Sequence, residues 1–513
     1  MNRRSFVKTA VSAFAATPLV SRIPRSAAAT AKFDPAFATA SQAVRAIHAG
    51  VISARELTEH TYRRIMQHNP KVNAFVTLIE EHAMARAREA DEALAAGKVW
   101  GPLHGLPIVI KDSFSTAGVR TTSGSKKFEN RVPREDAVAV ARLKRAGAII
   151  IGKTNLPEFA RDNQTHNEVA GTTNNPWDPR RTSGGSTGGG AAALAAGFGF
   201  LELGSDIAGS IRNPSHFCGI YGHKPTLDVV PNESATPGAA INAPNFLGVS
   251  GPMARGAEDL SLMLEIIGGR VPAEAVALQW KLPPARRARL RDYRIGYVMD
   301  DPFCAVTAEV RDVLTNAIGA LRKAGVNLHE GWPAGIDPEA QFDAYYFLLL
   351  ARFARPATER QSNQPKSDAD APWQYYAKKN REALAASHWD WAARTASRLR
   401  ARAVWQEYFK TYDAFLLPGN FVAAFPHNHE MPAYRRMLDT PEGRRLYYDV
   451  MKWISLATLS GCPATVAPVG RTRGGLPVGL QIMGPYLEDA TPIDIARLMA
   501  DVVGGYEAPP GYA

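Results

Sequence analysis

The stretch from Arg181 to Ser215 reads RTSGGSTGGGAAALAAGFGFLELGSDIAGSIRNPS and carries two serines, Ser186 and Ser210, on glycine-rich turns. Between them, the small apolar residues Ala191 to Gly197 indicate a tightly packed helix, and Phe198 to Leu203 indicate a short buried strand. A hydroxyl on a glycine-flanked turn at a helix N-terminus lies beside unpaired backbone N–H groups, which favour negative charge. We therefore expect both serines to lie where a developing anion is stabilised.

A serine hydroxyl is a poor nucleophile and needs a base. The sequence offers one upstream, where the apolar run Leu106 to Ile110 in LHGLPIVIKD ends in Lys111. An ammonium group at the end of a buried strand is costly, so we expect burial to lower the lysine pKa and leave an amine that accepts a proton. Lys111, Ser186 and Ser210 are thus a candidate relay of the Ser-Lys kind.

Each of these features has a plainer interpretation when it is taken alone. A Gly/Ser-rich stretch is usually a linker or turn, and a lone lysine after a strand is usually a solvated end. A Walker phosphate-binding loop is excluded, because no lysine follows the last glycine of GGSTGGG as that motif requires. The presence of all three elements in this order favours catalysis over the plainer interpretations.

GGSTGGGAAALAAG followed by GSDIAGSIRNPS, with GLPIVIKD upstream, resembles the amidase signature family of Ser-cis-Ser-Lys hydrolases. Further matches are GKTNLPEFA, FCGIYGHKPT and GPMAR, and the resemblance runs from Ala40 to Gly504. By position, it implies that Ser210 is the acyl-accepting nucleophile and Lys111 the terminal base. It implies that Ser186 is the bridging serine, entered through a cis peptide bond from Gly185.

The resemblance also implies an oxyanion hole made by the backbone N–H groups of Ile207, Ala208, Gly209 and Ser210. Removing one such donor typically lowers the rate by about 100- to 1000-fold. Many family members have a second glycine where this chain has Ala208. The Cβ atom there narrows the backbone conformations open to the turn.

Asp206 and Arg212 flank the nucleophile. We expect them to pair with the backbone or with each other and so to hold the turn, rather than to take part in the chemistry. Ser183, Ser205 and Ser215 are interpreted as turn or cap residues.

Elsewhere, helical patterns alternate with short apolar strands. Ala40 to Ala96 is helical by pattern, and PREDAVAVARLKRAGAIIIGKT predicts a helix from Glu135 to Ala146, ended by Gly147, before a buried strand from Ala148 to Ile151. Further elements are expected as a strand at 294–299, a helix at 310–324, and strands at 414–417, 463–468 and 478–483. This alternation predicts an α/β layered fold. The resemblance sharpens it to a single large domain whose mixed, twisted β-sheet core is covered by helices on both faces.

Between about Ala334 and Tyr448 the matches to the family fade and aromatic residues accumulate. In relatives this region helps to wall the acyl-side pocket. We expect most of the aromatic residues to pack helices and a subset to line a wide apolar cleft suited to aryl or medium-chain acyl groups. Residues Gln361 to Ala371 are expected to form an exposed polar loop. The aromatic residues are Phe342, Tyr345, Tyr346, Phe353, Trp373, Tyr375, Tyr376, Trp389, Trp391, Trp405, Tyr408, Phe409 and Phe425.

The first residues predict an export signal. NRRSFVK resembles the twin-arginine motif, an apolar run from Thr9 to Val20 follows, and Ala27-Ala28-Ala29 offers a small-residue cleavage site. Residues 1–29 are therefore expected to be a signal peptide and residues 30–513 the enzyme, in the periplasm or outside the cell. No later stretch approaches the roughly 18 apolar residues of a membrane span, so no stable membrane association is expected.

The formal charge of +11 includes five basic and no acidic residues within 1–29, and the remaining surplus forms no basic block. This distribution argues against a nucleic-acid partner. Three cysteines provide no disulfide framework, and Cys218 is expected to be buried rather than reactive. His427 and His429 form a His pair in a proline-rich loop, where we expect no metal. No cofactor is predicted, and the chain is expected to be a monomer or homodimer.

These observations predict an amidase that hydrolyses linear carboxamides or anilides through a serine acyl-enzyme, with activity that rises with pH through the lysine pKa. An esterase or urethanase with the same triad is the nearest alternative. An A-type amidotransferase subunit shares the architecture, but the export signal disfavours it. An exported binding protein without catalysis is disfavoured because all three relay residues are present.

Overall fold

The computed structural model describes residues 33–231, 246–351 and 371–512. The predicted signal peptide and nearly all of the loop predicted at 361–371 lie outside these ranges, as does Phe353. From Asp34 onward the chain forms one compact unit.

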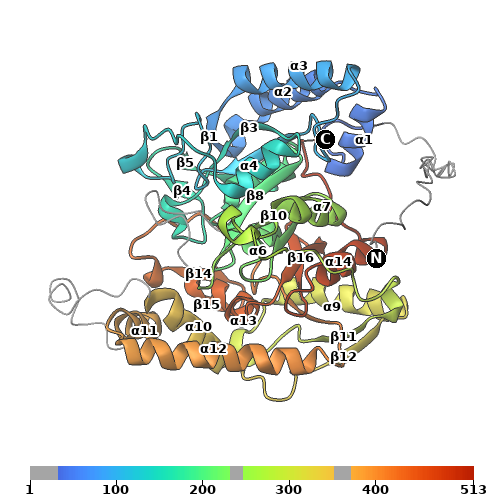
Figure 1. Ribbon diagram of the computed structural model, residues 1–513. Coiled ribbons are helices and arrows are strands. Elements are labelled where there is room, and N and C mark those ends of the chain that lie inside the picture. Colours follow the sequence, from blue (N-terminus) through green and yellow to red (C-terminus); the bar gives the residue numbers. More distant parts are fainter. Residues whose placement is uncertain (1–32, 232–245, 352–370, 513) are drawn as a thin grey trace, which may run out of the picture. The chain divides into compact units, whose positions relative to one another are not determined.

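A mixed sheet of eleven strands runs through this unit, in the order β1-β3-β2-β8-β10-β9-β16-β17-β13-β11-β12 (Figure 1). β2 is parallel to β3 and β8, and β11 is parallel to β12 and β13, whereas the other neighbours are antiparallel. The strands are β1 (Phe75–Leu78), β2 (Pro107–Lys111), β3 (Ile149–Thr154), β8 (Leu201–Asp206), β9 (Tyr221–Lys224), β10 (Val249–Ala254), β11 (Arg294–Tyr297), β12 (Asn327–Glu330), β13 (Ala414–Pro418), β16 (Ala464–Arg471) and β17 (Pro477–Met483). Three small two-stranded ribbons pair β4 (His166–Asn167) with β5 (Gly171–Thr172), β6 (Asn174–Asn175) with β7 (Asp178–Thr182), and β14 (Met437–Thr440) with β15 (Gly443–Leu446).

Helices cover both faces of the large sheet. α5 and α6 pack on each other and on β8, β9 and β17, while α7, α9 and α14 form a second group against β10, β16 and β17. The helices are α1 (Ala40–His48), α2 (Ala54–Val72), α3 (Glu80–Ala95), α4 (Val138–Arg145), α5 (Gly188–Ala195), α6 (Arg212–Cys218), α7 (Ala257–Ile267), α8 (Pro272–Ala275), α9 (Ala308–Lys323), α10 (Pro338–Ala351), α11 (Gln374–Leu384), α12 (His388–Tyr408), α13 (Lys452–Ser460) and α14 (Ala490–Val503). Every residue of the central strands β2, β8, β10 and β17 is buried, as expected for a sheet enclosed on both faces.

The α/β fold predicted from the sequence is therefore confirmed. The helix expected at 135–146 is α4, that expected at 310–324 is α9, and the strands expected near 294, 414, 463 and 478 are β11, β13, β16 and β17. The helical interpretation of 40–96 is incomplete, because β1 separates α2 from α3 and pairs with β3. Its four residues, FVTL, are too few to show a strand period within a helical region.

The segment of weak family resemblance contributes a separate helical layer. α10 contacts α11, α12 and α13, and Figure 1 shows these helices gathered at one end of the sheet. Most of its aromatic residues are buried, as the sequence predicts; among them are Phe342, Tyr345, Tyr346, Tyr376 and Trp405. Two of the predicted packing residues instead lie on the surface, where Trp389 is 79% exposed and Tyr375 is 42% exposed.

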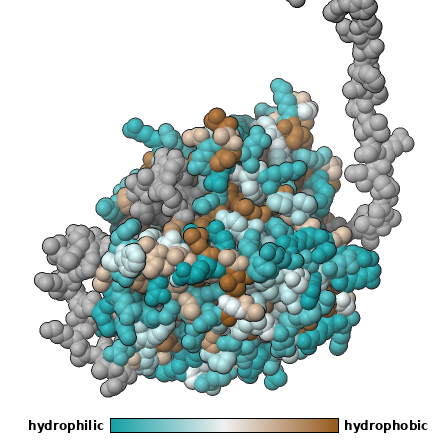
Figure 2. All heavy atoms as spheres, turned by 60° about the horizontal axis from the view of Figure 1, so that its bottom comes forward, coloured by the Kyte–Doolittle hydropathy of each residue, from teal (hydrophilic) through white to brown (hydrophobic). Residues whose placement is uncertain are grey.

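The face shown in Figure 2 is largely hydrophilic, with small hydrophobic patches between charged side chains. Among the described residues, no helix is both long and apolar enough to cross a membrane.

Candidate active site

Two neighbouring strands carry the polar groups of the site to the same edge of the sheet. β2 and β8 are parallel and adjacent, with Val109 opposite Glu202, so both end at the same side. β2 ends in Lys111, and β8 ends in Ser205 and Asp206. The turn before α5 supplies Ser186 and Thr187 to the same place.

Lys111 lies at the centre of this cluster and is completely buried. Its Nζ donates to Ser186 Oγ at 2.7 Å, and to Thr187 Oγ1 and Ser205 Oγ at 3.0 Å each. Burial lowers the pKa of Lys111 to about 7, although the carboxylates of Glu202 and Asp206 oppose the shift. Near neutral pH the amine is therefore available in its uncharged form, which has a lone pair to accept a proton from one of these hydroxyls.

The peptide bond between Gly185 and Ser186 is cis, as the family resemblance implied. Gly185 fits against the backbone of 162–164 so closely that a Cβ atom there would lie 2.7 Å from Asn163 C and Gln164 N. A side chain at this position would push the turn away from its neighbour. Glycine at 185 thus lets the chain deliver Ser186 to Lys111.

Ser210 lies on the turn between β8 and α6 and is 3% exposed. Its backbone carbonyl accepts a hydrogen bond from Thr187 N at 3.1 Å, which fixes the two serine turns against each other. Within the described ranges, no hydrogen bond joins the hydroxyls of Ser186 and Ser210. The structure thus joins Lys111 to Ser186 by their side chains, and Ser210 to the same turn by its backbone.

The four predicted oxyanion donors are not equivalent. Gly209 N–H donates to Asp206 Oδ1 at 3.1 Å, so this group is directed at the carboxylate. In the described part of the chain, nothing accepts a hydrogen bond from the N–H groups of Ile207, Ala208 or Ser210. Gly209 has a φ of +86°, whereas Ala208 is not among the residues with positive φ, so the turn accommodates a Cβ atom at 208.

Asp206 and Arg212 form a buried, bidentate ion pair, with Arg212 Nη2 2.8 Å from Asp206 Oδ1 and Arg212 Nε 3.0 Å from Oδ2. Burial alone would raise the pKa of Asp206, but the Arg212 guanidinium, together with Lys224 and the Ile211 N–H group, leaves this pKa below the usual value. Asp206 also accepts from Ile211 N at 3.1 Å. The pair therefore holds the turn on which Ser210 lies.

The sequence analysis did not predict three residues of the site. Ser205, interpreted as a turn residue, contacts Lys111 instead, and Thr187 does the same. Glu202 is completely buried, accepts a hydrogen bond from Thr154 Oγ1 at 2.8 Å, and leaves Oε2 without a partner. Burial raises the pKa of Glu202 above its usual value. Side-chain alternation does not identify Ser205, because Val109 pairs with Glu202 and so Glu202, not Ser205, has the parity of Lys111. No sequence signal identifies Thr187 either.

The aromatic segment contacts the site through a side chain of α10. Tyr345 OH, on α10, donates to Ile207 O at 3.0 Å, so α10 rests on the turn that carries the predicted oxyanion donors. Tyr346, the next residue, points elsewhere and donates to Asn380 Oδ1 at 2.7 Å.

The other residues singled out from the sequence lie in packed surroundings. All three cysteines are free and buried, and burial raises the pKa of Cys218 above its usual value. His429 stacks on His166 with ring centroids 4.2 Å apart and lies 5.8 Å from the ring of His427. In the described ranges, no group of three or more His, Cys, Asp or Glu side chains is arranged to hold a metal ion.

Known proteins resemble this chain over almost its whole length. The family model described as Amidase matches residues 56–492. The A subunit of the glutamyl-tRNA(Gln) amidotransferase of Thermosynechococcus vestitus is 33% identical over 465 residues, which cover 86% of this chain and 93% of the relative.

Solved structures agree with this assignment. The A subunit of the glutamyl-tRNA(Gln) amidotransferase from Thermotoga maritima is 26% identical, with a TM-score of 0.72 that covers 93% of this chain and 98% of that one. A bacterial aryl acylamidase of the amidase signature family has a TM-score of 0.77 over 93% and 99% of the two chains, and its 22% identity shows a common fold alone. With a family model across most of the chain and a relative above 30% identity, the chain belongs to the amidase family.

Proposed function

We propose that this enzyme hydrolyses linear carboxamides or anilides with aryl or medium-chain acyl groups, through an acyl-enzyme on Ser210. The observation that carries the proposal is the 2.7 Å hydrogen bond between Lys111 Nζ and Ser186 Oγ in a fully buried site. A lysine is useful as a base only when it is uncharged, and burial favours that form.

In the proposed reaction, neutral Lys111 takes a proton from Ser186, and Ser186 takes one from Ser210 as Ser210 Oγ bonds to the substrate carbonyl carbon. The free N–H groups of the 207–210 turn stabilise the oxyanion. The proton returns along the relay to the nitrogen, the C–N bond breaks, and the amine or ammonia leaves. Water then attacks the acyl-enzyme and releases the carboxylate.

The test is turnover of an aryl amide by purified protein and by three variants. Ser210→Ala should remove turnover and labelling by an acylating serine probe, while Ser186→Ala and Lys111→Ala should each lower kcat by orders of magnitude. Thr187→Val is the matched control, because Thr187 also contacts Lys111 but has no place in the relay. Normal turnover by Ser210→Ala would overturn the proposal.

A second candidate is the A component of an amidotransferase, which the curated relatives favour. The two functions differ in where the amide nitrogen goes: a hydrolase releases it, and an amidotransferase passes it to an acceptor. Assays of ammonia release from simple amides, with and without glutamyl-tRNA(Gln) and candidate partner subunits, separate them. An esterase or urethanase would be recognised by a higher kcat/KM on the ester or carbamate matched to the same amide.

We also propose that residues 1–29 direct export by the twin-arginine route and that residues 30–513 are the mature enzyme. The NRRSFVK motif supports this. Replacing Arg3 and Arg4 by lysine should retain the protein in the cytoplasm, as measured by fractionation. Unchanged export of that variant would contradict the twin-arginine route, and cytoplasmic location of the natural protein would favour the amidotransferase instead.

A further inference from the structure

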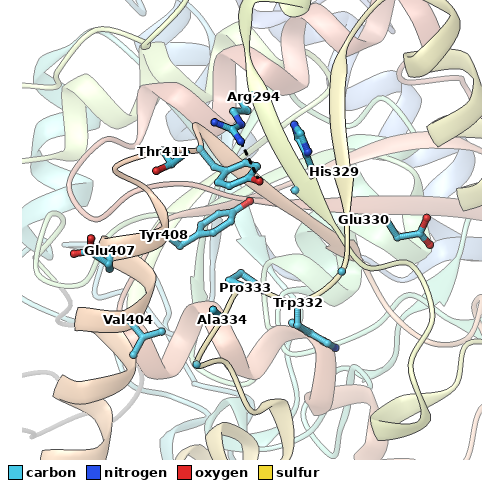
Figure 3. A pocket seen from close by; sticks show the side chains of 14 residues that line it. Arg294, His329, Glu330, Trp332, Pro333, Ala334, Val404, Glu407, Tyr408 and Thr411 are labelled. Carbon is cyan, nitrogen blue, oxygen red and sulfur yellow. Dashed lines mark hydrogen bonds between the residues drawn. The ribbon is translucent and has the colours of Figure 1, made fainter.

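A cavity outside the site lies about six strands away from it along the sheet, or about 30 Å at the usual spacing between strands. Its volume is about 720 Å³. It lies between the β11–β12 edge of the sheet, the loop that follows β12, and the C-terminal end of α12; Figure 3 shows its lining. The residues used below are Arg294, His329, Trp332, Val404, Tyr408 and Tyr412.

The strand register explains why this cavity exists. Gly296 of β11 pairs with His329 of β12, and side chains alternate along a strand, so Arg294, Gly296 and His329 share one face. A Cβ atom at Gly296 would collide with the hydroxyl of Tyr408. The glycine thus leaves room for the Tyr408 ring to lie across the strand.

The aromatic walls of the cavity are held in place by their own contacts. Tyr408 and Tyr412 stack with ring centroids 4.5 Å apart and planes 6° apart. Trp332 stacks on Phe415 at 5.7 Å, and its Nε1 donates to Asp301 Oδ2 at 2.8 Å. Rigid aromatic surfaces of this kind bind planar apolar groups at little entropic cost.

Two polar groups at one side of the cavity lack the partners they would normally have. The Arg294 guanidinium lies 4.4 Å from the centre of the Tyr412 ring and donates to Tyr412 OH at 3.4 Å; among the described residues, no carboxylate pairs with it. His329 Nε2 is buried and has no hydrogen-bond partner. Nε2 has no surface open to the cavity, so the Arg294 guanidinium is the group with which an anion placed here would pair.

The acidic residues of the lining do not supply that anion. Glu330 accepts a hydrogen bond from Tyr297 OH at 2.7 Å, and Glu407 pairs with Lys410 at 2.6 Å. Figure 3 shows the two carboxylates on opposite sides of the cavity, with Arg294 and His329 between them. Their negative charge at the rim disfavours polyanions, so a ligand with a single negative charge fits best.

From this geometry we propose that the cavity binds aromatic monocarboxylates, with the carboxylate on Arg294 and the ring against Tyr408, Tyr412 and Trp332. The site is separate from Lys111 and Ser210. It does not depend on the reaction proposed for them.

Titration calorimetry of the full-length protein with sodium phenylacetate tests the proposal. We expect saturable binding that Arg294→Gln weakens at least about tenfold, the usual effect of removing one charge-assisted hydrogen bond. Val404→Trp, which fills the cavity from α12, should weaken binding as strongly without removing a charge. Arg55→Gln, on the remote helix α2, is the control and should leave the affinity within about twofold.

Two further probes fix the ligand class. 2-Phenylethylamine, which carries the opposite charge, and acetate, which lacks the ring, should both bind at least about tenfold more weakly than phenylacetate. Absence of saturable phenylacetate binding would overturn the proposal. So would an affinity that Val404→Trp leaves unchanged, because the ligand would then occupy another site.

Discussion

In the proposed mechanism the chemistry depends on Lys111, because its charge decides whether Ser186 can lose a proton. Burial lowers its pKa to about 7, so the amine is protonated and inactive below that pH and neutral above it. We expect kcat/KM for an amide to rise about tenfold per pH unit below pH 7 and to level off above it. A pH-rate profile measures this directly. A profile that is flat, or highest in acid, would contradict the role of Lys111.

Glu202 is the carboxyl group with the largest electrostatic effect on the pKa of Lys111. Its buried carboxyl, when ionised, favours the charged form of Lys111, and Lys153 is the other cation that acts on it. Glu202→Gln keeps an acceptor for Thr154 but cannot ionise, so it should shift the acid limb of the pH-rate profile to lower pH. Asp259→Asn is the control, because it removes a buried carboxyl that instead caps α1, and its profile should coincide with that of the natural enzyme. If Glu202→Gln gives an unshifted limb, the coupling is absent.

At the scale of elements, a hydrogen bond from Tyr345 OH to Ile207 O joins α10 to the 207–210 turn. Tyr345→Phe removes it and loosens the turn whose N–H groups are proposed to hold the oxyanion. We expect kcat/KM to fall by about two- to tenfold, the usual range for one neutral hydrogen bond. Tyr346→Phe removes a hydrogen bond of the same helix that points at Asn380. It is the matched control and should retain activity, so equal losses in the two variants would show that only helix packing was affected.

At the scale of the molecule, the three free thiols report on global unfolding. Cys218 ends α6, Cys304 lies before α9, and Cys462 lies between α13 and β16, yet all are buried and burial raises the pKa of each. We expect no reaction with a thiol reagent in the native state and reaction of all three in denaturant. Ala392→Cys, on an exposed position of α12, should add one fast-reacting thiol as a control. A native protein with a fast thiol of its own would show that one of these regions opens locally.

The sequence alone predicted much of this architecture. Strands such as β13 and β17 are short, wholly buried runs, and a helix such as α9 repeats its buried residues every three or four positions, so local pattern suffices to find them. The sequence did not predict β1, because four residues inside a helical region are too few to show the two-residue alternation of a strand. Whether an aromatic residue of the α10–α12 layer is buried or exposed depends on packing partners far away in the chain, which the local pattern does not show.

For the site, the sequence by itself determined which residues are candidates: a lysine that ends an apolar strand and two serines on glycine-rich turns. Only the tertiary structure decided their surroundings, because the parallel pairing of β2 with β8 and the packing of α5 bring Ser205 and Thr187 into contact with Lys111 and place the charge of Glu202 nearby. It likewise decided that Gly209 N–H is taken by Asp206, and that Arg294 is left without a carboxylate partner among the described residues. Local patterns follow from covalent neighbours, whereas desolvation and hydrogen-bond competition depend on groups brought together from distant parts of the chain.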